Sequence, residues 1–329
     1  MTVPLPLYIN DLPDCVTSSI ARLFTDDTFV FCHIASCNDA DALQRDTGTL
    51  QQWTDTWFMQ FIPSKCQVLR VTLKQKPVKA SYTINGQTLE EVDSAKLLGM
   101  DIDSKLTFSN HVDSICKRAN SSRAFLSRNL RSCTKDTHDI TYITYLRPTV
   151  EYASTVWDPH TCRNTNKREQ VQCHSARYVT GNRDYNCRMV QDLGWSTLEQ
   201  HCWNSRLTVM YKIFNHQVDD DFLSKCSLSQ SITRGHASCI VQPKCSCVIC
   251  SNSFPRTTRD WNVLPVDPST IHTVDAFKSY LKPLKCRLSI AFSLIVFICR
   301  KRGVPGWCAL ILCERLHFYG RRRRLCCYL

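Results

Sequence analysis

The sequence from Leu12 to Phe31 reads Leu-Pro-Asp-Cys-Val-Thr-Ser-Ser-Ile-Ala-Arg-Leu-Phe-Thr-Asp-Asp-Thr-Phe-Val-Phe, with the acidic pair Asp26-Asp27 at its centre. Apolar residues flank this pair on both sides, and two such runs joined by a short polar segment predict a β-hairpin. The hairpin would present two carboxylates at an exposed tip on a stiff, buried base. Proteins usually bind Mg²⁺ through one or two carboxylates together with substrate phosphates. A solvated turn is the simpler alternative, because Asp is a common turn residue.

The residues around the acidic pair resemble a polymerase motif. Residues 8–13 read YINDLP and residues 23–28 read LFTDDT, which is similar to the pattern YINDLP and LFADDT in the palm of reverse transcriptases from non-LTR retrotransposons of the jockey type. Thr25 stands where Ala is usual, a small change that should fit the turn. The resemblance implies that Asp26 is a ligand of Mg²⁺ or Mn²⁺ and that Asp27 is its partner in two-metal phosphoryl transfer.

The chain after the hairpin predicts a helix and then a strand. Apolar residues at helical spacing from about residue 38 to residue 58 include Trp53 and Trp57, for which we expect core packing. Asn38-Asp39 or Asp41 can cap this helix. By resemblance, the following Lys65 matches a lysine near the incoming triphosphate, where it could stabilise or protonate the leaving pyrophosphate. Without the resemblance, an exposed surface lysine would be the preferred interpretation.

Further strings carry the resemblance over residues 6–284. Asn85-Gly86 predicts a hairpin with a type I′ turn, and residues 97–108 are similar to the strand pair that grips the primer end. The string at residues 147–161, RPTVEYASTVWDPHT, recurs in these transposon proteins, and we expect Tyr152 and Trp157 in it to be core anchors. A further match lies at residues 253–265, and a short helix is expected from Val274 to Leu281.

Residues 110–131 predict a helix with an apolar face and a basic remainder. Such a composition suits a thumb helix beside a phosphate backbone, and equally suits a solvated helix. The candidate nucleic-acid-binding residues on it are Lys117, Arg118, Arg123 and Arg128.

Composition limits the possible classes of protein. The chain has 329 residues, of which 43% are hydrophobic and 21% charged, so it is expected to fold around a core. Residues 285–329 hold ten of the basic residues and one acid, so most of the net charge of +12 belongs to this segment. The 21 cysteines follow no regular framework and no signal peptide opens the chain, which predicts reduced thiols in an intracellular protein, nuclear or cytoplasmic and not secreted.

The cysteine-rich segment before residue 253 offers a candidate zinc site. Zinc sites use paired cysteines separated by a longer loop, whereas the four cysteines here lie close together in sequence. We therefore favour a plain loop and do not expect Zn²⁺ there. The cysteines are Cys239, Cys245, Cys247 and Cys250.

The tail, residues 285–329, lies beyond the resemblance. Its apolar run at residues 288–299 is too short for a membrane span, which needs about 20 residues, and no transmembrane segment is expected. A membrane-surface anchor, a nuclear signal and read-through into non-coding sequence are the alternatives, and we favour the last, with a disordered tail.

We therefore expect an α+β fold in four parts. Residues 1–108 form a partial reverse-transcriptase palm with a primer-grip-like hairpin, residues 109–224 a helical thumb-like region, residues 225–284 a loop-rich C-terminal region and residues 285–329 the tail. Polymerases of this class need a further metal-binding Asp well upstream of the acidic pair, and only 25 residues precede Asp26 here. The resemblance thus implies an RNA-directed DNA polymerase fragment of a mobile element, truncated before the fingers and inactive by itself.

The partners implied by the resemblance are an RNA template, a DNA primer and deoxynucleoside triphosphates. Two alternatives remain open, a non-catalytic nucleic-acid-binding remnant and an inert translated relic. The sequence does not determine an oligomeric state.

Overall fold

The protein was analysed as a computed structural model, which describes residues 8–182, 188–218, 228, 236–242, 244–245, 251–252, 254–284, 307–313 and 316–318. The chain divides into two compact units. Unit 1 comprises residues 1–107 and 298–329, and unit 2 comprises residues 108–297. The division falls beside the boundary expected at residue 108.

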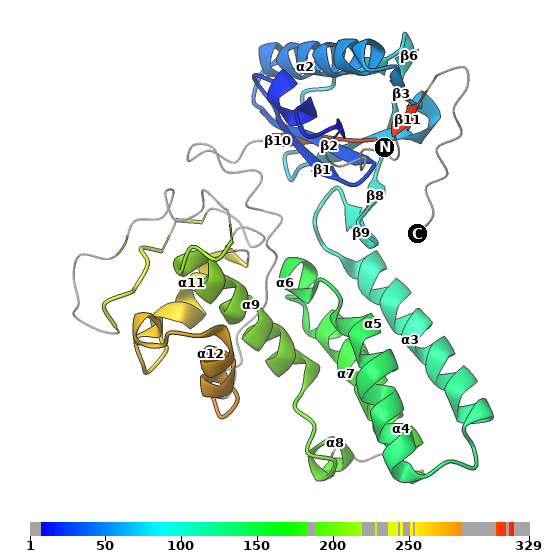
Figure 1. The fold of residues 1–329 in the computed structure, drawn as a ribbon, viewed down its shortest axis with the longest axis vertical. Helices are drawn as coiled ribbons and strands as arrows, with labels where there is room; N and C mark the ends of the chain where they lie inside the picture. Colours follow the sequence, from blue (N-terminus) through cyan, green and yellow to red (C-terminus); the bar gives the residue numbers. More distant parts are fainter. Residues whose placement is uncertain are drawn as a thin grey trace. The chain divides into compact units, whose positions relative to one another are not determined.

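Unit 1 is built on a mixed sheet covered by one long helix (Figure 1). The sheet has the strand order β1-β2-β10-β4-β7. Before residue 108, the described helices and strands of unit 1 are η1 Leu12–Cys15, β1 Ile20–Phe24, β2 Asp27–Ile34, α2 Cys37–Thr56, β3 Met59–Phe61, η2 Pro63–Lys65, β4 Cys66–Val71, β5 Thr83–Ile84, β6 Gln87–Thr88, β7 Glu90–Val92, β8 Ser94–Leu97 and β9 Met100–Asp103.

Two strands of unit 1 come from the C-terminal tail. Strand β10, Trp307–Cys313, lies antiparallel to both β2 and β4, and β11, Leu316–Phe318, pairs with β3. Within the described residues, β10 is the strand that joins β1-β2 to β4-β7 in one sheet. These strands differ from the disordered tail expected from the sequence. The apolar run at residues 288–299 lies outside the described residues.

Helix α2 covers the sheet with the predicted apolar stripe. Leu43, Leu50 and Trp53 are buried in the same core as Val30 and Val68 of the sheet. Burial of such side chains contributes about 1.5–3 kcal/mol each.

The ends of α2 differ from two expectations. Trp57 is 40% exposed at the helix end, so its predicted core packing is wrong. The N-cap is Ser36, and Asp39 accepts its backbone N–H in a capping box.

Two short hairpins flank β7 in the chain. Asn85 and Gly86 both have positive φ, and Ile84 pairs with Gln87, as the predicted type I′ turn requires. The second hairpin turns at Leu98-Gly99, again with two positive φ angles. It lies within the segment compared with a primer grip.

Unit 2 is helical. Its described helices are α3 Ser109–Asn129, α4 Lys135–Thr141, the π-helix η3 Tyr142–Leu146, α5 Arg147–Glu151, α6 Ser154–Trp157, α7 Cys162–Thr180, α8 Arg188–Asp192, α9 Leu198–Phe214, α11 Phe254–Asn262, η5 Pro268–Thr270 and α12 Val274–Leu281. Helix α7 ends at Gly181, whose φ is +68°, and the side chain of Thr197 caps α9 by accepting from the backbone N–H of Gln200.

The part of unit 2 that was expected to be loop-rich contains two helices. Helices α11 and α12 pack against α9 around the buried side chains of Trp261 and Phe277. The string at residues 253–265 is therefore largely helical. No helix in the described ranges is long and apolar enough to cross a membrane.

Candidate active site

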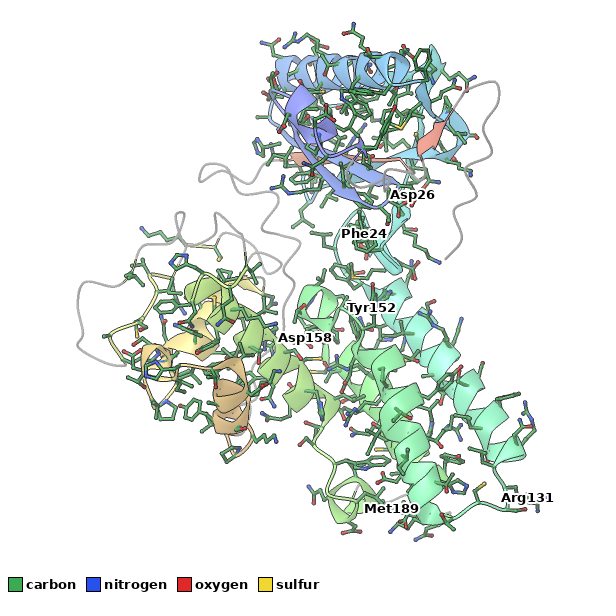
Figure 2. The ribbon with its side chains drawn as sticks, viewed as in Figure 1. Phe24, Asp26, Arg131, Tyr152, Asp158 and Met189 are labelled. Atoms are coloured by element: carbon green, nitrogen blue, oxygen red, sulfur yellow. The ribbon has the colours of Figure 1, made fainter. Side chains whose placement is uncertain are left out.

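The acidic pair lies where β1 turns into β2. Phe24 pairs with Asp27, so the loop has only two residues, Thr25 and Asp26, and Asp27 opens β2. Both carboxylate residues are half-buried, in contrast to the exposed tip expected from the sequence. Figure 2 shows Asp26 beside Phe24 at the end of the hairpin. Adjacent carboxylates at a strand end suit the oxygen coordination of Mg²⁺ or Mn²⁺.

Lys65 lies at the same end of the sheet as the acidic pair. In the sheet, Cys313 of β10 pairs with Thr28 of β2 on one side and with Cys66 of β4 on the other. Asp27 and Lys65 each precede one of these residues, and β2 and β4 run in the same direction. Two strand spacings separate the backbones, which is roughly 10 Å. Lys65 is exposed at the end of η2 and can extend its side chain from there.

A buried carboxylate ties the segment before the hairpin to α2. Asp46, which is 3% exposed, accepts hydrogen bonds from the backbone N–H groups of Thr17, Ser18 and Ser19 at 3.1, 2.9 and 2.6 Å. The hydroxyl of Ser19 donates a further one at 2.8 Å. Burial raises the pKa of Asp46, but these hydrogen bonds outweigh burial and hold the pKa below its usual range.

The motif YINDLP also has a structural role. Asp11 accepts a hydrogen bond from the indole Nε1 of Trp53 at 3.2 Å. Its segment continues into η1, where Leu12 is fully buried in the core under α2. The first half of the motif is therefore attached to α2 through Asp11, and the segment that leads into the second half is attached through Asp46.

Thr25 occupies a conformation that a β-branched residue rarely adopts. Its φ is +53°, and the left-handed region costs an ordinary L-residue about 1–2 kcal/mol. The turn thus stores strain directly beside Asp26.

Replacing Thr25 with asparagine is expected to raise the free energy of unfolding by about 0.5–1 kcal/mol, because Asn tolerates positive φ better. Urea denaturation with hydrogen exchange of the β1 and β2 amides would measure the gain. The same change at Thr88, an exposed strand residue without positive φ, serves as the control. An equal gain at both positions would contradict the strain argument.

The basic candidates of α3 belong to unit 2, whereas the acidic pair and Lys65 belong to unit 1. Lys117, Arg118 and Arg128 are exposed, and Arg123 is half-buried.

Of the four cysteines considered for Zn²⁺, Cys239 is buried and Cys245 half-buried, while Cys247 and Cys250 lie outside the described residues. Among the residues that the structure describes, no three His, Cys, Asp or Glu side chains form a group that could hold a metal ion.

The sequence interpretation missed a buried ionic cluster in unit 2. Asp158 contacts Arg206 at 3.2 Å and both Arg168 and Arg256 at 3.6 Å (Figure 2). These three arginines are at most 1% exposed. Asp158 and Arg256 come from the two strings, at residues 147–161 and 253–265, that carried the resemblance.

The two aromatic anchors expected in the first of these strings have different environments. Trp157 is fully buried as predicted, and Arg168 lies over its ring at 5.6 Å from the centroid. Tyr152 is 57% exposed, so its predicted place in the core is wrong. Its carbonyl oxygen accepts the indole N–H of Trp157 instead.

The comparisons with known proteins point to one class. The chain is similar to RNA-directed DNA polymerases of non-LTR retrotransposons, which confirms the resemblance carried by the motifs. No protein-family model and no solved structure matches the chain.

Three relatives from Drosophila melanogaster represent this class. Each is 27% identical to the chain: the probable RNA-directed DNA polymerase from transposon BS over 59% of this chain and 22% of its own length, that from transposon X-element over 53% and 20%, and the RNA-directed DNA polymerase from mobile element jockey over 48% and 18%. The chain thus matches about a fifth of each curated relative.

Proposed function

We propose that unit 1 is part of the palm of an RNA-directed DNA polymerase, with Asp26 and Asp27 as the metal-binding carboxylates. The observation that supports this most is the common position of the acidic pair and Lys65 at one end of the β1-β2-β10-β4-β7 sheet. The similarity to retrotransposon polymerases agrees with it. Unit 2 would then be the thumb-like region of an α+β polymerase.

Each residue of the site has a defined task in this proposal. Asp26 and Asp27 offer hard oxygen ligands at a strand end, and the position of this strand end is fixed by packing of the core beneath it. Bound Mg²⁺ or Mn²⁺ would supply charge stabilisation for the attacking and leaving oxygens at the α-phosphate. Lys65 would donate to the leaving pyrophosphate of the incoming deoxynucleoside triphosphate.

The partners in this proposal are an RNA template and a DNA primer. The exposed side chains of Lys117, Arg118 and Arg128 on α3 provide positive charge for contacts with their phosphates. Such contacts position a strand without reading its sequence.

Primer extension on an RNA template tests the proposal. Any extension that wild type shows with Mg²⁺ or Mn²⁺ is expected to be lost in Asp26→Asn, because this variant lacks one carboxylate ligand. Asp55→Asn, an exposed aspartate in α2, is the matched control and should extend like wild type. Absence of extension in folded wild type would reject an autonomous polymerase.

A non-catalytic nucleic-acid-binding role is the second candidate. The basic exposed face of α3 favours it, because this face does not involve the acidic pair. It predicts an affinity for nucleic acid that falls with salt and survives Asp26→Asn. Both candidates predict that Asp26→Asn binds nucleic acid without extending a primer, so extension by wild type, measured beside its binding, separates them.

A further inference from the structure

Unit 2 contains a cavity between two helices that run in the same direction. Helices α3 and α7 contact each other near their N-termini through Ser109 with Asn164 and through Asp113 with Lys167. Farther along both helices, Arg123, Ser127, His174, Arg177, Tyr178, Gly181 and Asn182 line a cavity of about 530 Å³. This volume lies within the roughly 300–1,000 Å³ range of small-molecule sites.

Three basic side chains converge on this cavity. Arg123 comes from α3, and His174 and Arg177 come from α7. Burial lowers the pKa of His174, and the positive charges of Arg123 and Arg177 lower it further. The described residues that line the cavity include no aspartate or glutamate. The charge of Arg177 disfavours the charged form of Arg123, so an anion placed between the two guanidinium groups would be stabilised, and it would also favour protonation of His174.

The helix dipole explains only part of this arrangement. Cations are stabilised near helix C-termini, but the effect falls off within the last turn. Arg177 lies in the last turn of α7, which ends at Thr180. Arg123 and His174 both lie before the last turn of their helices, which end at Asn129 and Thr180. The helix dipole therefore does not explain why Arg123 and His174 lie beside Arg177.

Two buried donors are available in the same cavity. The Nε of Arg123 and the hydroxyl of Tyr178 are buried and have no hydrogen-bond partner among the described residues. The ring of Tyr178 packs on His138 of α4, with the centroids 4.5 Å apart, which fixes its direction. Buried donors without partners are costly, so a ligand that accepts from them would be stabilised.

We propose that this cavity binds a phosphate group of a nucleic-acid strand. Guanidinium groups suit phosphate because they present several donors in a planar fork. A strand fits better than a free ion because the cavity exceeds the size of one phosphate, and α3 continues with the exposed Arg128. The proposal rests on the proposed function, whose template or primer would be the strand.

Fluorescence anisotropy with a labelled single-stranded RNA oligonucleotide tests the site in the full chain. Arg123→Gln and Arg177→Gln are each expected to weaken binding about tenfold and to reduce the slope of log affinity against log salt by about one. Arg163→Gln removes the same charge from an exposed position near the start of α7 and should bind within about twofold of wild type. Circular dichroism verifies that each variant is folded.

Two further variants, Arg123→Lys and Asp26→Asn, and the binding of inorganic phosphate separate the remaining outcomes. Arg123→Lys should recover part of the affinity, because it restores charge without the fork. Unchanged RNA affinity in both glutamine variants, or loss of inorganic phosphate binding without loss of RNA binding, would overturn the proposal. Asp26→Asn should bind like wild type, so failure of primer extension and failure of this site give different results.

Discussion

Replacing Asp158 with asparagine is expected to lower the free energy of unfolding of unit 2 by about 3–5 kcal/mol, because it removes a carboxylate that pairs with three buried arginines, of which Arg206 and Arg256 keep Asp260. The carboxylate is 2% exposed and lies within 3.6 Å of Arg168, Arg206 and Arg256. An uncompensated buried guanidinium is far from water and cannot lose its proton near neutral pH. The buried positive charge can therefore be hydrated only if water enters, and this requires the core of unit 2 to open.

The cluster around Asp158 connects three parts of unit 2. Asp260 of α11 also contacts Arg206, at 3.2 Å, while Arg168 of α7 donates to the sulfur of Cys202 at 2.9 Å. Burial raises the pKa of the Cys202 thiol to about 12, so it stays neutral and adds no negative charge. Asp158 is thus the only carboxylate in the described residues for which an ion pair with all three arginines is seen.

Hydrogen exchange during urea denaturation would measure this loss, with peptides from α7 and α9 as the readout. Asp275→Asn is the control, because Asp275 forms an exposed pair with Lys278 and should leave stability unchanged. A loss below about 1 kcal/mol for Asp158→Asn would show that the arginines do not depend on this carboxylate.

Local patterns in the sequence predict most of the regular structure. The acidic hairpin and the turn at Asn85-Gly86 follow from turn preferences that act over a few residues. The long helices follow from apolar spacing. The helix α11 was missed because the motif match at residues 253–265 carried no helical expectation.

Contacts between distant residues could not be predicted in this way. Strand β10 enters the sheet from the C-terminal tail, and its pairing with β2 and β4 depends on register rather than on local pattern. Asp158 and Arg256 are recognisable as parts of two separate strings, but nothing in either string indicates that they meet. The same applies to Arg123 and Arg177, which lie on two helices far apart in the sequence.

The candidate active site illustrates both what local sequence patterns predict and what depends on contacts between distant residues. The motif around residue 26 and the position of Lys65 in sequence are sufficient to name three candidate residues. Their common location at one sheet end depends on β10, which faces Thr28 on one side and Cys66 on the other. The support that Asp46 gives to the hairpin was also missed, because a lone Asp in an amphipathic helix is usually solvated.

Replacing Asp46 with asparagine is expected to lower the free energy of unfolding of unit 1 by about 2–4 kcal/mol. The carboxylate accepts from three consecutive backbone N–H groups, those of Thr17, Ser18 and Ser19. Hydrogen bonds to a charged acceptor contribute about 1.5–3 kcal/mol each, and unpaired buried donors add a penalty. Asparagine turns one acceptor into a donor that faces these N–H groups, so part of the network is lost.

The same residue predicts how stability depends on pH. Because the folded-state pKa of Asp46 lies below its ordinary value of 3.8, its contribution is present above that value and is lost as the pH falls through the folded-state pKa. The gap in stability between wild type and Asp46→Asn should therefore narrow below about pH 4. Urea denaturation at a series of pH values, read by exchange of the α2 and β1 amides, measures the gap. A gap that is constant from neutral pH to acid would show that the charge of Asp46 does not hold the segment before the hairpin.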